Sequence, residues 1–214
     1  MKIATIVVTR GKSCHVKTLH TILKFNIICI QNGGVQNEVV FVNDDPFEKS
    51  DMIHKFIKTH DRIFFVDFGI HVDDESMKLV IDKNEGFGAV VFPGVKEGIN
   101  WDVFKEKVLA ESTEPVEQLG LDFDTEVATK LSENIYTVKN TSAKSWVLMS
   151  KHVLKQIKDK RTGLYKIHPK LDVMFNKFKE HSVKIVAFTA AKLIYTYSHE
   201  CIGNIVNSSG VKAT

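Results

Sequence analysis

The chain has 214 residues, 43% of them hydrophobic, so it is long and apolar enough to bury the core of one large domain. Its 29 lysines and arginines stand against 26 aspartates and glutamates, and a formal charge of +3 is too balanced for a protein that binds nucleic acid through a basic surface. The densest basic cluster runs from Lys151 to Arg161 and is typical of the solvated face of a helix.

Nothing in the sequence indicates secretion or a membrane partner. The amino terminus, Met1–Arg10, lacks the long apolar segment of a signal peptide, and no stretch approaches the roughly 20 apolar residues of a membrane span. Cys14, Cys29 and Cys201 are odd in number, far apart and without the spacing of a metal site. We therefore expect a cytoplasmic protein in a reducing compartment.

Strands and helices alternate through the first half of the chain. Runs rich in apolar and β-branched residues predict strands at 3–9, 26–31, 38–42 and 63–66. Apolar residues at helical spacing and capping signals predict helices at 13–24 and 46–60, and a short helix capped by Asp73 or Asp74. This alternation predicts a parallel sheet with helices on both faces.

The second half has shorter strands and longer loops. We expect strands at 88–92, 134–138, 145–149 and 183–188, helices at 100–110, 150–158 and 169–180, and a long polar loop at 111–129. The fold class is therefore predicted to be α/β, with one domain built on a central mixed, mostly parallel sheet flanked by helices. It spans residues 1–207, and residues 208–214 have the composition of a linker to further domains.

The apolar run at 63–66 ends abruptly at the carboxylate Asp67. Such a run is typical of a strand buried on both faces of a sheet, and open α/β sheets bind ligands at the carboxyl ends of these strands. A carboxylate held there can bind a divalent cation, which in turn can hold phosphate oxygens. The equally weighted alternative is that Asp67 caps the following turn.

Two other motifs are weaker. The turn at 10–13 is not a phosphate-binding P-loop, because Ile6 stands where that motif needs a glycine. The literal Asp-x-Asp at 122–124 follows no buried strand, so we interpret it as a surface loop.

The remaining candidates are histidines and one further acid. His71, His168, His181 and His199 are potential metal ligands, although a single histidine is more often an ordinary surface or core residue. Asp172 lies at the start of a largely apolar helix, where it is either a carboxylate that suits the helix dipole or a general base.

Taken in order, these segments resemble the glycosyltransferase A fold of nucleotide-sugar-dependent glycosyltransferases, a Rossmann-like, nucleotide-sugar-binding fold. Residues 8–10 resemble the nucleoside-binding strand end, and 63–69 the strand that carries that family's Asp-x-Asp motif. Residues 142–150 resemble the small-residue segment that lines the sugar pocket. Residues 171–175 with 183–186 resemble the acid-bearing helix and closing strand, and 192–199 the late segment with a metal-binding histidine.

The resemblance implies a UDP-sugar donor and Mn²⁺ or Mg²⁺ as cofactor. It implies nucleotide-sugar contacts from five positions, which are Thr9, Arg10, Asn32, Asp67 and Ala143. It further implies metal ligation by Asp67 and His199, and a catalytic base at Asp172, or at Asp73 as second choice. Gly69 departs from the family pattern because it replaces the second aspartate of the motif.

The chain as a whole also resembles the amino-terminal domains of large chlorovirus glycosyltransferases, which glycosylate the viral major capsid protein. That resemblance implies a capsid glycan as acceptor and the host cytoplasm as location. Two other functions remain open on the residues themselves: a nucleotidyltransferase that acts on a sugar phosphate, and a non-catalytic binding or assembly module.

Overall fold

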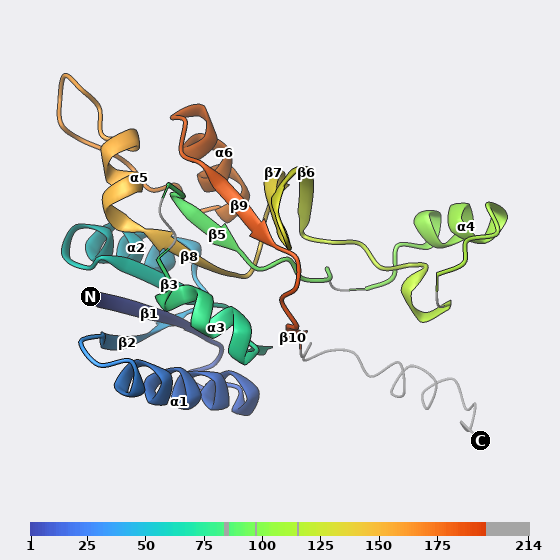
Figure 1. Ribbon diagram of the computed structural model, residues 1–214, viewed down its shortest axis with the longest axis horizontal. Helices are drawn as coiled ribbons and strands as arrows, with labels where there is room; N and C mark the ends of the chain where they lie inside the picture. The colour runs from blue at the N-terminus through green and yellow to red at the C-terminus, as the bar shows by residue number, and fades with distance from the viewer. Residues whose placement is uncertain (84–85, 97, 115, 196–214) are drawn as a thin grey trace.

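A computed structural model describes residues 1–83, 86–96, 98–114 and 116–195. Its core is a mixed sheet of eight strands in the order β2-β1-β3-β8-β5-β9-β7-β6, and β10 and β4 form a second, two-stranded sheet (Figure 1). The strands are β1 (Lys2–Thr9), β2 (Gln36–Asn43), β3 (Arg62–Val66), β4 (Ile70–His71), β5 (Ala89–Val91), β6 (Thr125–Ser132), β7 (Ile135–Thr141), β8 (Ser145–Met149), β9 (Ile185–Phe188) and β10 (Ile194–Tyr195). The helices are α1 (Val16–Gln31), α2 (Pro46–Thr59), α3 (Asp74–Ile81), α4 (Trp101–Leu109), the 3-10 turn η1 (Val116–Gln118), α5 (Ser150–Ile157) and α6 (Leu171–Glu180).

Strand directions place several strand ends together. Strands β1, β2 and β3 are parallel, β8 runs antiparallel between β3 and β5, and β9 is parallel to β5. The residues that follow β1, β2, β3 and β5, and those that precede β8, therefore share one edge of the sheet, which we call the carboxyl edge. Its register is fixed by the pairing of Val66 with Ser145 and of Val91 with Trp146.

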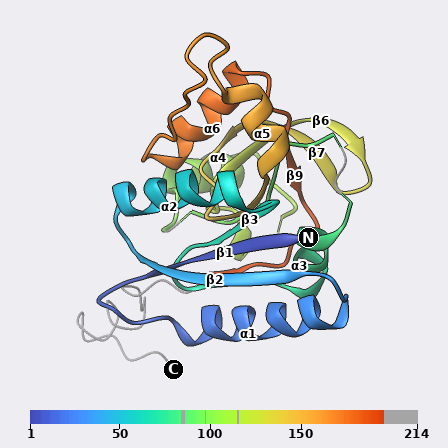
Figure 2. The same ribbon diagram turned by 90° about the vertical axis from the view of Figure 1, so that its left-hand side faces the viewer.

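Helices cover both faces of the sheet. Helices α2, α5 and α6 lie on one face, and α1 and α3 lie on the other (Figure 2). Alternate residues of the central strands enter the two cores, so Phe65 and Trp146 stack on one side at 4.7 Å while Phe64 packs against Phe25 of α1 on the other. Helix α4 buries none of its residues and stands away from the sheet (Figure 1).

The expected strand at 26–31 is wrong, because α1 continues to Gln31. Its apolar residues occupy both faces of one helix: Phe25 and Cys29 are buried against the sheet, whereas Ile27 and Ile30 are 55% and 78% exposed. A helix with two apolar faces has the same local composition as a buried strand, which explains the error.

Other boundaries also differ. His15 rather than Ser13 caps α1, and its ring nitrogen accepts from the Lys17 N–H. The polar segment expected to be a loop at 111–129 contains η1 and the first residues of β6. The remaining predicted elements are present within a few residues, and no described helix is long and apolar enough to cross a membrane.

Truncation should distinguish the two faces of α1. Phe25→Ala opens a cavity in the core and is expected to lower the free energy of unfolding by about 3–5 kcal/mol. Ile30→Ala changes an exposed side chain and should alter it by no more than about 0.5 kcal/mol. Chemical denaturation of both variants tests this, and equal large losses would favour the buried strand instead.

Candidate active site

Strand β3 delivers a buried carboxylate to the carboxyl edge. Asp67 directly follows Val66, its backbone N–H donates to the Lys144 carbonyl oxygen at 3.0 Å, and the residue is 9% exposed. Within the described parts of the chain its carboxylate accepts one hydrogen bond, from the Phe68 N–H at 2.8 Å. Burial raises the pKa of Asp67, although the Phe68 N–H, Lys49 and Lys144 oppose that rise. A strand-end acid perturbed in this way marks a candidate functional site.

Two cationic side chains, Arg10 and Lys49, meet at Asp44 near this acid, and the charge of Lys49 acts on Asp67. Arg10 follows β1, and its Nε donates to Asp44, which follows β2, at 2.9 Å. Lys49 donates to the other oxygen of Asp44 at 2.7 Å, and the Arg10 guanidinium lies 5.1 Å from the centre of the Phe68 ring. Burial works to raise the pKa of Asp44, but the hydrogen bonds and charges of Lys49 and Arg10 outweigh it and lower that pKa.

The segment 142–145 joins Asp67 to a second buried acid, Asp124. The Lys144 carbonyl oxygen accepts from the Asp67 N–H, and the Ser142 N–H donates to the Asp124 carbonyl oxygen at 2.8 Å. The charge of Lys144 acts on both carboxylates, because it works to lower the pKa of each. Asp67, Lys144 and Asp124 therefore form one electrostatic unit at the carboxyl edge.

Asp124 is held more firmly than Asp67. Its carboxylate accepts from the Gly94 N–H at 3.1 Å, the Thr125 hydroxyl at 2.8 Å and the Tyr195 hydroxyl at 3.3 Å. Burial nevertheless raises the pKa of Asp124 against these three donors. A Cβ atom at Gly94 would overlap the Tyr195 ring, so the glycine allows β10 to close over the end of β5.

The interpretation of residues 122–124 as a surface loop is therefore wrong for Asp124. Asp122 does lie at the surface, where it pairs with Lys96 at 2.7 Å. Asp124, however, is only 6% exposed and its N–H donates to the Gly94 carbonyl oxygen. The contact joins two segments far apart in sequence, and the only local signal was the run of β-prone residues that begins at Thr125.

A cleft of about 570 Å³ opens beside Asp124. Asp172, in the first turn of α6, lines it, together with Ser142 and Lys96. Four acids face this cleft: Asp122, Asp124, Glu126 and Asp172. The structure thus brings the expected base Asp172 to the same cleft as the segment expected to line the sugar pocket.

The other expected residues at this edge have structural contacts. The Thr9 hydroxyl donates to the Val42 carbonyl oxygen at 2.9 Å, and Ala143 is completely buried. Asp73 caps α3, where its carboxylate accepts from the Ser76 hydroxyl at 2.6 Å and from the Lys192 N–H at 2.9 Å. Burial would raise the pKa of Asp73, but these and other N–H donors lower it.

One expected residue is not brought to this site, and another lies outside the described residues. Asn32 caps the carboxyl end of α1, next to Gly34, whose carbonyl oxygen accepts from the Met1 amino group. It therefore lies near the start of β1, whereas Thr9 ends that strand about 23 Å away at the usual rise per residue. His199 lies outside the described residues.

The carboxyl edge has few ligands for a metal. Among residues 1–83, 86–96, 98–114 and 116–195, no group of three histidines, cysteines or acids is arranged to hold an ion. Gly69, in place of the second aspartate, has φ +76°, a conformation that glycine adopts readily and that turns the chain from β3 into β4. Asp67 is then the single carboxylate best placed to bind a metal ion at this edge.

No protein-family model and no curated protein sequence matches this chain. A crystal structure of GalNAc-T7 with UDP, GalNAc and Mn²⁺ resembles it with a TM-score of 0.50 and 11% sequence identity, covering 92% of this chain and 44% of that one. The chain thus spans less than half the length of that protein. The inositol-1-phosphate CTP transferase from T. maritima is also similar, with a TM-score of 0.45, 11% identity and 98% of each chain covered. The likeness to GalNAc-T7 confirms the predicted α/β fold of glycosyltransferase A type.

Asp67 and Asp44 should affect the free energy of unfolding with opposite signs. Because the pKa of Asp67 is raised above its ordinary 3.8, the folded protein binds more protons through that window and the free energy of unfolding falls as pH rises. Asp67→Asn should therefore raise the unfolding temperature at neutral pH by about 2–4 °C without ligands, and the gain should vanish below the ordinary pKa.

Asp44→Asn is the matched control. The pKa of Asp44 is lowered, so its charge stabilises the fold above pH 3.8 and this contribution is lost as pH falls through the lowered pKa. Asp44→Asn should lower the unfolding temperature at neutral pH. Thermal unfolding from about pH 3 to pH 8 measures both variants, and a destabilised Asp67→Asn protein would contradict the argument.

Proposed function

We propose that residues 1–207 form the catalytic domain of a glycosyltransferase that moves a hexose or deoxyhexose from a UDP-sugar to a glycan acceptor. The observation that carries the proposal is the buried Asp67 carboxylate at the end of the central strand, with the ion pairs of Arg10 and Lys49 to Asp44 at the neighbouring strand ends. Ligands of open α/β sheets bind at this edge. GalNAc-T7, which has a similar fold, was crystallised with UDP, GalNAc and Mn²⁺, which supports a UDP-sugar donor.

The donor diphosphate would lie over the ends of β1 and β2. The Arg10 side chain is 43% exposed, and its planar guanidinium suits bidentate contact with phosphate oxygens. Thr9 would contribute through its backbone, because its hydroxyl is already bonded to Val42. Ala143 is completely buried, so it would contribute through the backbone of the segment 142–145.

Mn²⁺ or Mg²⁺ fits the donor set at this edge. Such ions are commonly held by one or two protein carboxylates and complete their coordination with substrate phosphates and water. Asp67 would hold the ion, because its carboxylate is buried at the strand end and a bound cation would offset the cost of burying its charge. A bound ion would supply Lewis-acid stabilisation of the departing diphosphate. His199 remains a proposed second ligand.

For an inverting reaction we assign the proton transfer to Asp172. The acceptor hydroxyl oxygen attacks the anomeric carbon, the bond from that carbon to UDP breaks, and a carboxylate takes the hydroxyl proton. Asp172 faces the cleft and is exposed to an incoming acceptor. Asp124 is the alternative base, because its raised pKa suits proton uptake, whereas Asp73 is occupied as a helix cap.

The acceptor is proposed on the sequence resemblance alone. It would be a glycan of a viral major capsid protein, glycosylated in the host cytoplasm. The cleft beside Asp124 is open enough to admit part of such a glycan, because its volume lies within the usual range of small-molecule sites.

Nucleotide binding provides the first test. Thermal unfolding with UDP and Mn²⁺ together, at about 100 times the dissociation constant, should add roughly 2.7 kcal/mol to the free energy of unfolding. ADP should give a smaller shift, and Asp67→Ala should abolish the dependence on Mn²⁺. Release of pyrophosphate rather than UDP during turnover would identify a nucleotidyltransferase, and no nucleotide binding would favour an assembly module.

The role of Asp172 is tested by turnover. Asp172→Asn should lower kcat about 10²–10⁴-fold while leaving the UDP–Mn²⁺ shift unchanged, since the base acts on the acceptor. Asp122→Asn, which removes an exposed charge from the same cleft, is the control and should keep kcat within about threefold. Full turnover by Asp172→Asn, with loss in Asp124→Asn, would transfer the role to Asp124.

A further inference from the structure

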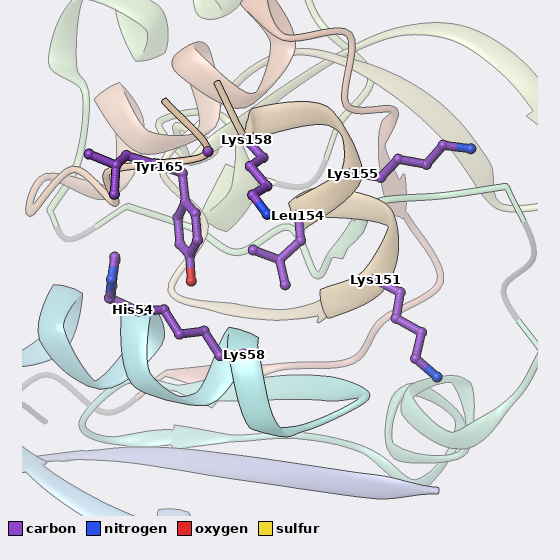
Figure 3. Close-up of a pocket in the computed structure, with 9 residues that line it drawn as sticks. His54, Lys58, Lys151, Leu154, Lys155, Lys158 and Tyr165 are labelled. Carbon is purple, nitrogen blue, oxygen red and sulfur yellow. The ribbon is translucent and has the colours of Figure 1, made fainter. Parts of the chain in front are cut away.

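A second cavity lies apart from the candidate active site at the carboxyl edge. It has a volume of about 610 Å³ and opens between α2, α5 and the segment that follows α5 (Figure 3). Helix α5 begins after Met149, which pairs with Arg62 at the start of β3, so the cavity approaches the sheet from the edge opposite Asp67. None of its lining residues lines the cleft beside Asp124.

Basic side chains from both helices line this cavity, and in Figure 3 the Lys158 side chain points toward Tyr165 whereas Lys151 and Lys155 extend away from it. Helix α5 and the residue after it contribute Lys151, Lys155 and Lys158, which share one helical face, and α2 contributes His54 and Lys58 one turn apart (Figure 3). The sequence cluster interpreted as a solvated face therefore supplies three of its lysines to a cavity. Helix α5 itself contains no acid.

Little negative charge balances these lysines. Lys151 pairs with Asp61 at 3.1 Å, whereas Lys155 and Lys158 have no ion pair within the part of the chain that the structure describes. The Lys58 ammonium lies 5.5 Å from the centre of the Tyr165 ring. The nearby Asp159 accepts hydrogen bonds from backbone N–H groups of its own loop. The cavity thus carries a net positive potential.

One buried polar atom also lacks a partner. The Tyr165 hydroxyl is inaccessible and has no hydrogen-bond partner among the described residues, while its ring stacks on His54 at 4.7 Å. Figure 3 shows this hydroxyl pointing into the space between Lys58 and Leu154. Leaving a buried hydroxyl unpaired costs free energy, and an oxygen acceptor in the cavity would remove that cost. Burial lowers the pKa of His54, with a smaller contribution from the charge of Lys58, and Asp51 opposes this change.

We propose that this cavity binds the phosphate groups of a polyanionic ligand, with Lys58, Lys155 and Lys158 neutralising the charge and Tyr165 donating to a phosphate oxygen. The volume lies in the range of small-molecule sites and exceeds what one phosphate needs. The site is separate from the carboxyl edge and does not depend on the transferase proposal. The phosphates can belong to a soluble polyphosphate or to a lipid headgroup.

Calorimetric titration of the whole chain with tripolyphosphate at low ionic strength tests the proposal. Lys155→Gln combined with Lys158→Gln should weaken binding at least about tenfold, and Tyr165→Phe about fivefold. Lys105→Gln combined with Lys130→Gln removes the same charge from exposed positions elsewhere and should leave affinity within about twofold. Equal weakening in both double variants would overturn the site, because it would show non-specific charge attraction.

Three further measurements test the proposal. In the unmodified protein, NMR titration should show the pKa of His54 rising when tripolyphosphate binds, since an anion stabilises the imidazolium. Co-sedimentation with phosphatidylcholine vesicles that carry a polyphosphoinositide identifies a lipid source if vesicles bind and tripolyphosphate does not. Absence of binding to both probes overturns the proposal. Retention of the UDP–Mn²⁺ shift in the Lys155→Gln/Lys158→Gln protein would show that the two sites are independent.

Discussion

The hydrogen bond from the Asp67 N–H to the Lys144 carbonyl oxygen is the contact on which the candidate active site depends. It fixes the end of the central strand to the segment that precedes β8, and that segment is fixed in turn to Asp124 through Ser142. Because strand β8 runs antiparallel between β3 and β5, its start meets their carboxyl ends. The antiparallel direction of β8 between these two strands therefore brings Lys144 to the segment that links Asp67 with Asp124.

Burial and pairing give the edge acids different properties. Asp44 has two cationic partners and keeps its charge easily, whereas Asp67 and Asp124 are buried without a directly bonded cation among the described residues. A paired acid such as Asp44 holds its cationic neighbours in place. Buried acids without such a partner, such as Asp67 and Asp124, take up a proton or a cation more readily. This division is consistent with a site in which Asp44 positions Arg10 and Lys49 while Asp67 binds the ligand.

Opposite edges of the sheet carry two kinds of chemistry. The acids lie at the carboxyl edge, and the basic cavity lies between α2 and α5, near the opposite edge. The stacked pair Phe65 and Trp146, with Phe175 packed on it at 5.8 Å, fills the core beneath α6. A rigid core of this kind allows either site to be altered without repacking the other, because distant substitutions are usually additive.

Local patterns in the sequence determined most of the elements and the place of Asp67, because an apolar run that ends in an acid defines a strand and its last residue without reference to the rest of the chain. They failed at residues 26–31, where inward Cys29 and outward Ile30 make a helix look like a strand. The burial of Asp124, its link through Lys144 to Asp67, and the cavity at Tyr165 were decided by the tertiary structure alone. Each depends on contacts between segments distant in sequence, and hydrophobic periodicity carries no information about such pairings.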